Sequence, residues 1–70
     1  MKIEAVSYII NKALTEDRTI IIKLNNGSII VTTSHNCSVY WDCNAITLNN
    51  EEEIISCDHI QHVLKGETQC

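Results

Sequence analysis

The sequence contains no phenylalanine and no proline, and it has only two glycines among its 70 residues. Aromatic residues make up 4% of the chain, whereas hydrophobic residues as a whole make up 44%. The core must therefore be built from isoleucine, valine and leucine. A chain of this length buries only about 60% of its surface when it folds. We therefore expect one small domain, residues 1–70, that forms a compact barrel or completes its core by self-association.

Positive charge is also scarce. The chain has five lysines and arginines against nine acidic residues, and its formal net charge is −4. A protein that neutralises several phosphates needs clustered cations, whereas these are scattered along the chain. The charge therefore disfavours nucleic acid as the main partner and favours a basic surface on another protein.

Long apolar runs and targeting signals are absent as well. No segment approaches the roughly 18 apolar residues of a membrane span. The first residues lack the charged leader and apolar block of a signal peptide, and the two glycines do not form a phosphate-binding loop. We predict a cytoplasmic protein that has no membrane contact.

Two β-rich segments, residues 18–25 and 28–34, surround the dipeptide Asn26-Gly27. Asn-Gly is the strongest short-range hairpin signal, because both residues accept the positive φ of a tight turn. The sequence therefore predicts a β-hairpin that seeds the fold. The residues expected to share a face are Ile20, Ile22 and Leu24 on the first strand, and Ile29, Val31 and Thr33 on the second.

An amphipathic helix is predicted before the hairpin, over residues 2–15. Its apolar residues recur at three- and four-residue spacings, and its charged residues lie largely on the other side. Such a short helix is marginal alone, so its apolar stripe must dock on the sheet. The residues expected in this stripe are Ile3, Val6, Ile10, Ala13 and Leu14.

Further strands are predicted over residues 39–48, 53–57 and 60–64, followed by a polar tail. The first is interrupted by Asp42-Cys43-Asn44, which is either a bulge or a second tight turn. The last is either a strand or a single helical turn. The fold class is therefore α+β: an N-terminal amphipathic helix and a small antiparallel sheet of four or five strands, bent or closed into a barrel.

Two features of this layout carry a family resemblance: the Asn26-Gly27 turn after the first strand, and the closing segment Ile54–Val63. The chain resembles the Sm-like family of small barrels and, more loosely, the SH3-like barrels. The resemblance implies an RNA-binding ring. The residues that it places near bases are Asn26, His35, Asn36 and His59, with Lys23 near a phosphate.

Four cysteines and three histidines are candidate zinc ligands. His35-x-Cys37 and Cys57-x-His59-x-x-His62 offer short spacings, but the chain has no Cys-x-x-Cys pair, which structural zinc sites commonly use. The alternative is that Cys43 and Cys57 are small buried hydrophobic residues and that Cys70 is a tail thiol. We therefore predict no metal and no cofactor.

Cys57 and His59 are also a candidate nucleophile and base. No third orienting group follows at a recognisable spacing, and the chain is small for a roomy pocket. The alternative is that the histidines face solvent. We therefore predict that the protein is not an enzyme.

Tyr40 and Trp41 are neighbours in a predicted strand, so their side chains should point to opposite faces. We expect one ring in the core and the other on the surface, where Trp and Tyr dominate the binding energy of protein interfaces. The alternative places the outward ring under the helix. The candidate binding residues are Tyr40, Trp41, Asp42, His35, Asn36 and His59.

Acidic side chains form a further candidate surface. Glu51-Glu52-Glu53 either imitates nucleic-acid phosphates, together with other carboxylates, or is a solvated turn. The other carboxylates considered for this surface are Glu16, Asp17, Asp42 and Asp58.

Taken together, these features predict a non-catalytic binding module. We expect a small acidic regulator or inhibitor, of phage or mobile-element type, that binds another protein and self-associates into a homo-oligomer. The alternatives are an Sm-like RNA-binding ring and a protein that binds a nucleotide or metabolite between protomers.

Overall fold

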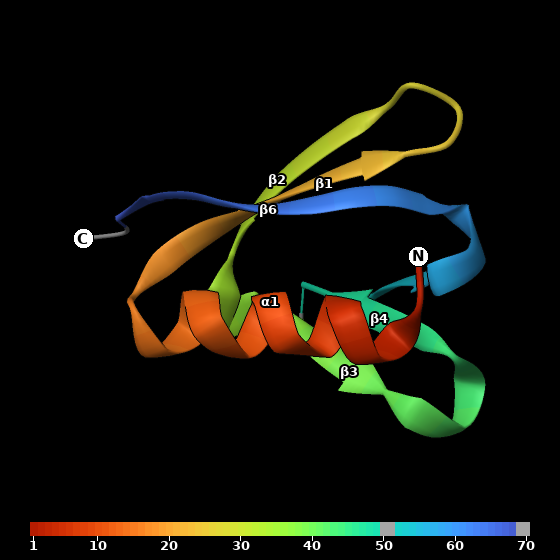
Figure 1. Cartoon of the computed structure of the whole chain (residues 1–70), viewed down its shortest axis with the longest axis horizontal. Coiled ribbons are helices and arrows are strands. Elements are labelled where there is room, and N and C mark those ends of the chain that lie inside the picture. The colour runs from red at the N-terminus through yellow and green to blue at the C-terminus, as the bar shows by residue number, and fades with distance from the viewer. Residues whose placement is uncertain (50–51, 69–70) are drawn as a thin grey trace.

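The computed structural model describes residues 1–49 and 52–68. It contains one α-helix, six strands and three short 3-10 turns within those residues (Figure 1). The elements in chain order are α1 (Ile3–Thr15), β1 (Arg18–Leu24), β2 (Ile29–Thr33), η1 (Ser34–Asn36), β3 (Ser38–Tyr40), η2 (Trp41–Cys43), β4 (Ala45–Leu48), β5 (Glu53–Ser56), η3 (Cys57–His59) and β6 (Ile60–Thr68).

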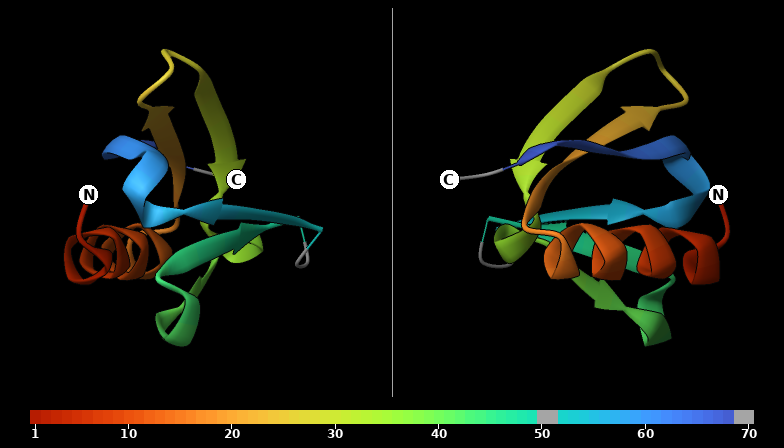
Figure 2. Two further views of the ribbon diagram at one scale, coloured as in Figure 1. Left: turned by 90° about the vertical axis from the view of Figure 1, so that its right-hand side faces the viewer. Right: turned by 60° about the vertical axis from the view of Figure 1, so that its left-hand side comes forward.

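The strands form two antiparallel sheets of three strands each, in the orders β2-β1-β6 and β3-β4-β5. Helix α1 runs along one side of the molecule, and the β1–β2 hairpin projects away from it (Figures 1 and 2). The α+β class with an N-terminal helix is therefore confirmed. The described strands do not close into a barrel, and they number six in two sheets rather than four or five in one.

Helix α1 buries the stripe that its spacing predicts. Ile3, Val6, Ile10 and Ala13 are all buried. Leu14 is the exception: it lies in the last turn, just before the chain turns into β1, and it is 43% exposed. No helix within residues 1–49 and 52–68 is long and apolar enough to cross a membrane.

The β1–β2 turn differs from the predicted two-residue form. The Leu24 amide donates to the Ser28 carbonyl (2.9 Å), and the Gly27 amide donates to the Leu24 carbonyl (3.0 Å). Gly27 has a φ of 92°, but Asn26 is not among the residues with positive φ. The loop is therefore Asn25–Gly27, a three-residue hairpin loop that needs the left-handed conformation only at its last position.

The two hairpin strands present different faces. Ile20 and Ile22, two of the three residues predicted to share a face of β1, are fully buried, and Leu24 is half-buried. Ile29 and Val31 do share a face of β2, but they are 62% and 64% exposed. They lie opposite Lys23 and Ile21 on the outer side of the sheet. Alternation places them on one face, but it does not say which face meets the core.

The predicted strand over residues 39–48 is two strands, which corrects that prediction. β3 ends at Tyr40, η2 reverses the chain, and β4 returns antiparallel with Tyr40 opposite Ala45. Asn44 has φ 52° and ψ 47°, and asparagine tolerates this left-handed conformation better than most residues. The interruption is therefore a tight turn, not a bulge.

The last strand is longer than predicted. η3 provides the helical turn, and β6 then runs through residues 65–68, which were expected to be a polar tail. Arg18 pairs with Thr68 in the sheet register, and the Arg18 side chain donates from Nε to the Gly66 carbonyl (2.9 Å). Residue 70, the predicted tail thiol, lies outside the described residues.

One aliphatic core connects the helix with both sheets. It contains no aromatic residue, and β4 crosses it with all four of its residues buried. Burial of such side chains contributes about 1.5–3 kcal/mol each before the entropic costs of folding. The buried residues of this core are Ile3, Val6, Ile10, Ala13, Ile20, Ile22, Ile46, Leu48, Cys57, Ile60 and Val63.

We predict that Ile22→Ala lowers the free energy of unfolding by about 2–5 kcal/mol, because it leaves a cavity in a closely packed core. Ile29→Ala, the same substitution on the outer side of the hairpin, should change it by less than about 0.5 kcal/mol. Urea unfolding followed by circular dichroism measures both values. Similar losses in the two variants would contradict the register of the hairpin.

Candidate functional site

The six candidate binding residues lie in three places. Trp41 and Asp42 belong to η2, and Tyr40 directly precedes it. His35 and Asn36 belong to η1, and His59 belongs to η3. Each group therefore sits on or beside a 3-10 turn that links two strands. Of the six residues, only Tyr40, Trp41 and Asp42 line a common depression, and these three are also contiguous in sequence.

Both aromatic side chains of the first group are on the surface. Tyr40 is 36% exposed and Trp41 is 55% exposed. This corrects the prediction that one ring enters the core. Strand alternation ends at Tyr40, and Trp41 already belongs to the turn, so the two side chains no longer have to point to opposite faces.

The surface around η2 is hollowed. A depression of about 430 Å³ is lined by Val39, Tyr40, Trp41, Asp42 and Cys43. It combines two aromatic rings, a carboxylate and an aliphatic side chain. Aromatic rings with a polar tip are enriched in protein interfaces.

Backbone hydrogen bonds close η2 and connect its end to η3. The Asn44 amide donates to the Trp41 carbonyl (3.3 Å) and closes the turn. The Asn44 carbonyl in turn accepts from the Cys57 amide (2.9 Å), which connects the end of η2 to η3. The turn that carries Trp41 is therefore hydrogen-bonded before any partner binds, and this reduces the backbone order that binding has to supply.

His35 lies elsewhere, beside the end of α1. Its Nε2 atom is 3.3 Å from Oδ1 of Asp17, and both side chains are more than half exposed. Asp17 has a φ of 55° at the turn between α1 and β1. His35 therefore contacts the turn after the helix, and neither it nor Asn36 lines the hollow beside Trp41.

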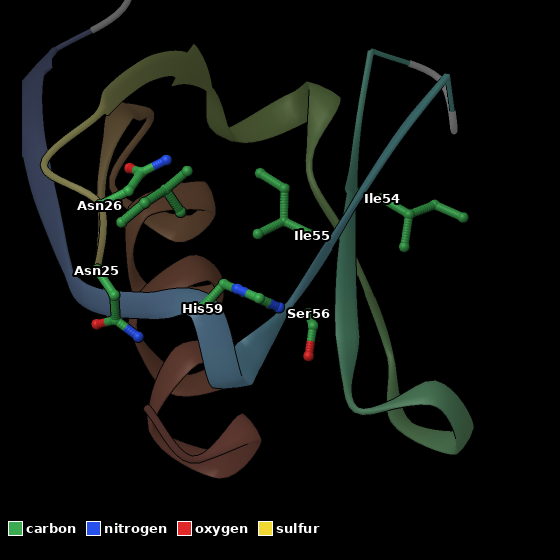
Figure 3. Close-up of a pocket in the computed structure, with 7 residues that line it drawn as sticks. Asn25, Asn26, Ile54, Ile55, Ser56 and His59 are labelled. Carbon is green, nitrogen blue, oxygen red and sulfur yellow. The ribbon is translucent and has the colours of Figure 1, made fainter.

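A second cavity lies between the tip of the β1–β2 hairpin and the β5–η3 segment (Figure 3). Its volume is about 490 Å³, within the range of small-molecule sites. It includes Asn26 and His59, two residues that the Sm-like resemblance places near bases, but not His35, Asn36 or Lys23. The residues that line it are Leu24, Asn25, Asn26, Ile54, Ile55, Ser56 and His59.

Hydrogen bonds fix the polar wall of this cavity. The Asn25 amide donates to the His59 carbonyl (2.9 Å), and Asn25 Nδ2 donates to the Asp58 carbonyl (2.9 Å). Ser56 Oγ accepts from the Asp58 amide (3.3 Å) and caps η3. Sequence reasoning missed this cavity, because the hairpin tip and η3 are more than thirty positions apart; the only local signal was the Asn-Asn-Gly turn.

Burial disfavours the thiolate forms of Cys37 and Cys57. Burial raises the pKa of Cys37 to about 11. Burial also raises the pKa of Cys57, and Asp58 adds to this while the N-terminal amino group opposes it. Since the thiolate is the nucleophile and the metal ligand, both groups are in the inert form at neutral pH. Within residues 1–49 and 52–68, no three His, Cys, Asp or Glu side chains lie close enough to hold a metal ion.

The acidic side chains do not form one surface among the described residues. Glu16 is 3.0 Å from Lys65 and 3.4 Å from Arg18, and the hydrogen bond from Lys65 is the main reason that its pKa is lowered. Asp42 and Asp58 lie on different turns. Glu51 lies outside the described residues. The Glu16 pairs lie at the surface, and such pairs contribute little to stability.

Comparisons of the chain with family models, curated proteins and solved structures found no match. The site therefore has to be interpreted from its own geometry.

We predict that iodoacetamide alkylates Cys43 first in a Cys70→Ser variant at mildly alkaline pH. Cys43 is exposed, Cys57 is buried and Cys37 is half-buried. The raised pKa of Cys37 lowers its thiolate fraction about a hundredfold relative to an ordinary thiol. Mass spectrometry of the digested protein gives the order of labelling. Labelling of Cys37 or Cys57 as fast as Cys43 would contradict the structure.

Proposed function

We propose that the protein is a non-catalytic module that binds another protein through the turn that carries Tyr40 and Trp41. One observation carries this proposal: all three aromatic residues of the chain are exposed, and two of them are adjacent on a single hydrogen-bonded turn. The third, Tyr8, is 64% exposed on the outer side of α1. Exposed Trp and Tyr are the residues that most often dominate interface energy.

The charge supports a basic protein surface as the partner. Asp42 stands in the turn beside the two rings, and the chain as a whole carries a net charge of −4. Such a charge steers association with a positive surface. A small acidic regulator or inhibitor that acts in the cytoplasm fits this combination.

The Sm-like or SH3-like assignment belongs to this proposal as well. The helix that precedes the strands and the two sheets that share one core support it. RNA binding is less well supported, because Lys65 and Arg18, two of the five cations, both contact Glu16.

Self-association through the outer side of the β2-β1-β6 sheet is the second part of the proposal. Val31 and Leu64 both pair with Ile21, one from each neighbouring strand, so the three form one row across the sheet. Ile29 lies beside this row, and Val31, Leu64 and Ile29 are each more than half exposed. A second copy with the same face would cover this apolar surface. Lys23, which pairs with Ile29 and His62, brings a charge beside the row.

We expect Trp41→Ala to weaken partner binding at least about 30-fold and to leave the far-UV circular dichroism unchanged, because the ring is a surface anchor and not a core residue. The partner is captured from a cell lysate on immobilised wild-type protein, and its affinity is measured by biolayer interferometry. As the only tryptophan, Trp41 should also become less accessible to acrylamide quenching when the partner binds.

Tyr8→Ala is the matched control, since it removes an exposed aromatic ring from α1 and should leave the affinity unchanged. If Tyr40→Ala and Trp41→Ala both retain the partner as well as the wild type does, the turn is not the interface. Binding of oligonucleotides that falls steeply with salt would instead support the RNA-binding alternative.

We predict that Val31→Lys converts the protein to a monomer, because it places a charge in the middle of the proposed contact between copies. Light scattering after gel filtration measures the mass. Ile54→Lys adds the same charge at an equally exposed aliphatic position on β5 and should preserve the oligomer. A wild-type mass of one chain, or dissociation of both variants, would refute this interface.

A further inference from the structure

The cavity between the hairpin tip and η3 has the composition of a ligand site rather than of a packing defect. Its volume is about 490 Å³, and its wall combines aliphatic with hydrogen-bonding side chains. Leu24 and Ile55 give it apolar sides, and Asn26, Ser56 and His59 give it polar groups. Small-molecule sites typically have this combination of an apolar lining and a few placed polar groups.

The Asn26 side chain is held in one orientation. Its Oδ1 atom accepts a hydrogen bond from the Ser28 amide (2.9 Å). This bond identifies the oxygen end of the side chain and directs Nδ2 away from the turn. In Figure 3, the Asn26 nitrogen is directed toward the β5 side of the cavity. Nδ2 makes no hydrogen bond within the described residues, so the cavity contains an oriented donor.

One further group faces the same space. The His59 ring extends between the hairpin and Ser56 in Figure 3, and its nitrogens can donate or accept. The Ser56 hydroxyl, which accepts from the Asp58 amide, is directed away from Asn26 and Ile55 in the same view. The cavity therefore offers a donor from Asn26 and a donor or acceptor from His59.

The side chains that line the cavity favour an uncharged ligand. No Lys, Arg, Asp or Glu of the described residues lines the cavity. An anion would find no positive partner in a chain of net charge −4, and a cation would find no carboxylate. Burial of an unpaired charge is costly, whereas a neutral polar group needs only its hydrogen bonds.

We propose that this cavity binds an uncharged planar molecule with a carboxamide or lactam group on one edge. The carbonyl oxygen of such a group accepts from Asn26 Nδ2, and its N–H donates to the His59 ring. The flat apolar body lies between Leu24 and Ile55. The site is contained in one chain and does not include the Tyr40–Cys43 turn, so it stands independently of the proposed protein interface.

Three isosteric probes test the proposal: benzamide, benzoate and benzamidine, which are neutral, anionic and cationic. Titrations followed by ¹H–¹⁵N NMR should show that benzamide shifts the amides of Leu24, Asn26, Ser56 and His59, with a dissociation constant on the order of 1 mM. Benzoate and benzamidine should bind at least about tenfold more weakly.

The Asn26→Asp variant tests whether the Asn26 donor contributes to ligand binding. The substituted side chain keeps an oxygen acceptor for the Ser28 amide, so the turn is preserved, but it loses the donor that faces the cavity. We expect benzamide affinity to fall about tenfold and benzamidine affinity to rise above that of the wild type. Asn36→Asp makes the same change on exposed η1, and it should alter neither affinity.

Each outcome is decisive. Equal binding of the three probes, benzamide affinity unchanged by Asn26→Asp, or shifts outside the cavity residues would overturn the proposal. Trp41→Ala should bind benzamide like the wild type, so a failure of the protein interface and a failure of this site are distinguishable.

Discussion

The structure depends on one aliphatic core that the helix and both sheets share. The stripe of α1 belongs to one core with Ile20 and Ile22 of β1 and with Ile46 and Leu48 of β4, which lie in different sheets. Small sheets are stable when a hydrophobic face is packed against another element. The shared core therefore joins the helix and the two sheets in one domain.

A core of Ile, Val and Leu has a consequence for the surface. Because these side chains fill the interior, the aromatic residues are left outside, where their exposure costs hydrophobic free energy. That cost is recovered when a partner covers them, which is why Tyr40 and Trp41 support a binding role. The same reasoning applies to Ile29 and Val31 on the outer side of the hairpin, for which a second copy of the chain is the proposed partner.

The 3-10 turns position the two candidate binding sites, the Tyr40–Cys43 turn and the cavity at His59. η2 and η3 are joined by the hydrogen bond from the Cys57 amide to the Asn44 carbonyl, and Asn25 joins η3 to the hairpin tip. The Met1 amino group also donates to the carbonyls of Cys57 and Ile60, both at 2.9 Å. η3 is thus the point where the helix, the hairpin and the aromatic turn meet. The aromatic turn and the cavity nonetheless present different chemistry: the turn exposes two aromatic rings beside a carboxylate, and the cavity is neutral and lined by hydrogen-bonding groups.

The sequence by itself determined the local features: the helix and its stripe, the hairpin with a left-handed Gly27, and which residues of β1 share a face. These follow from periodicity and turn chemistry, which act over a few residues. It could not determine that residues 39–48 reverse direction at Asn44, that both rings stay outside the core, or that Asn26 and His59 line one cavity. Those outcomes depend on which sheet each strand joins. Contacts between residues dozens of positions apart decide that, and only the tertiary structure contains them.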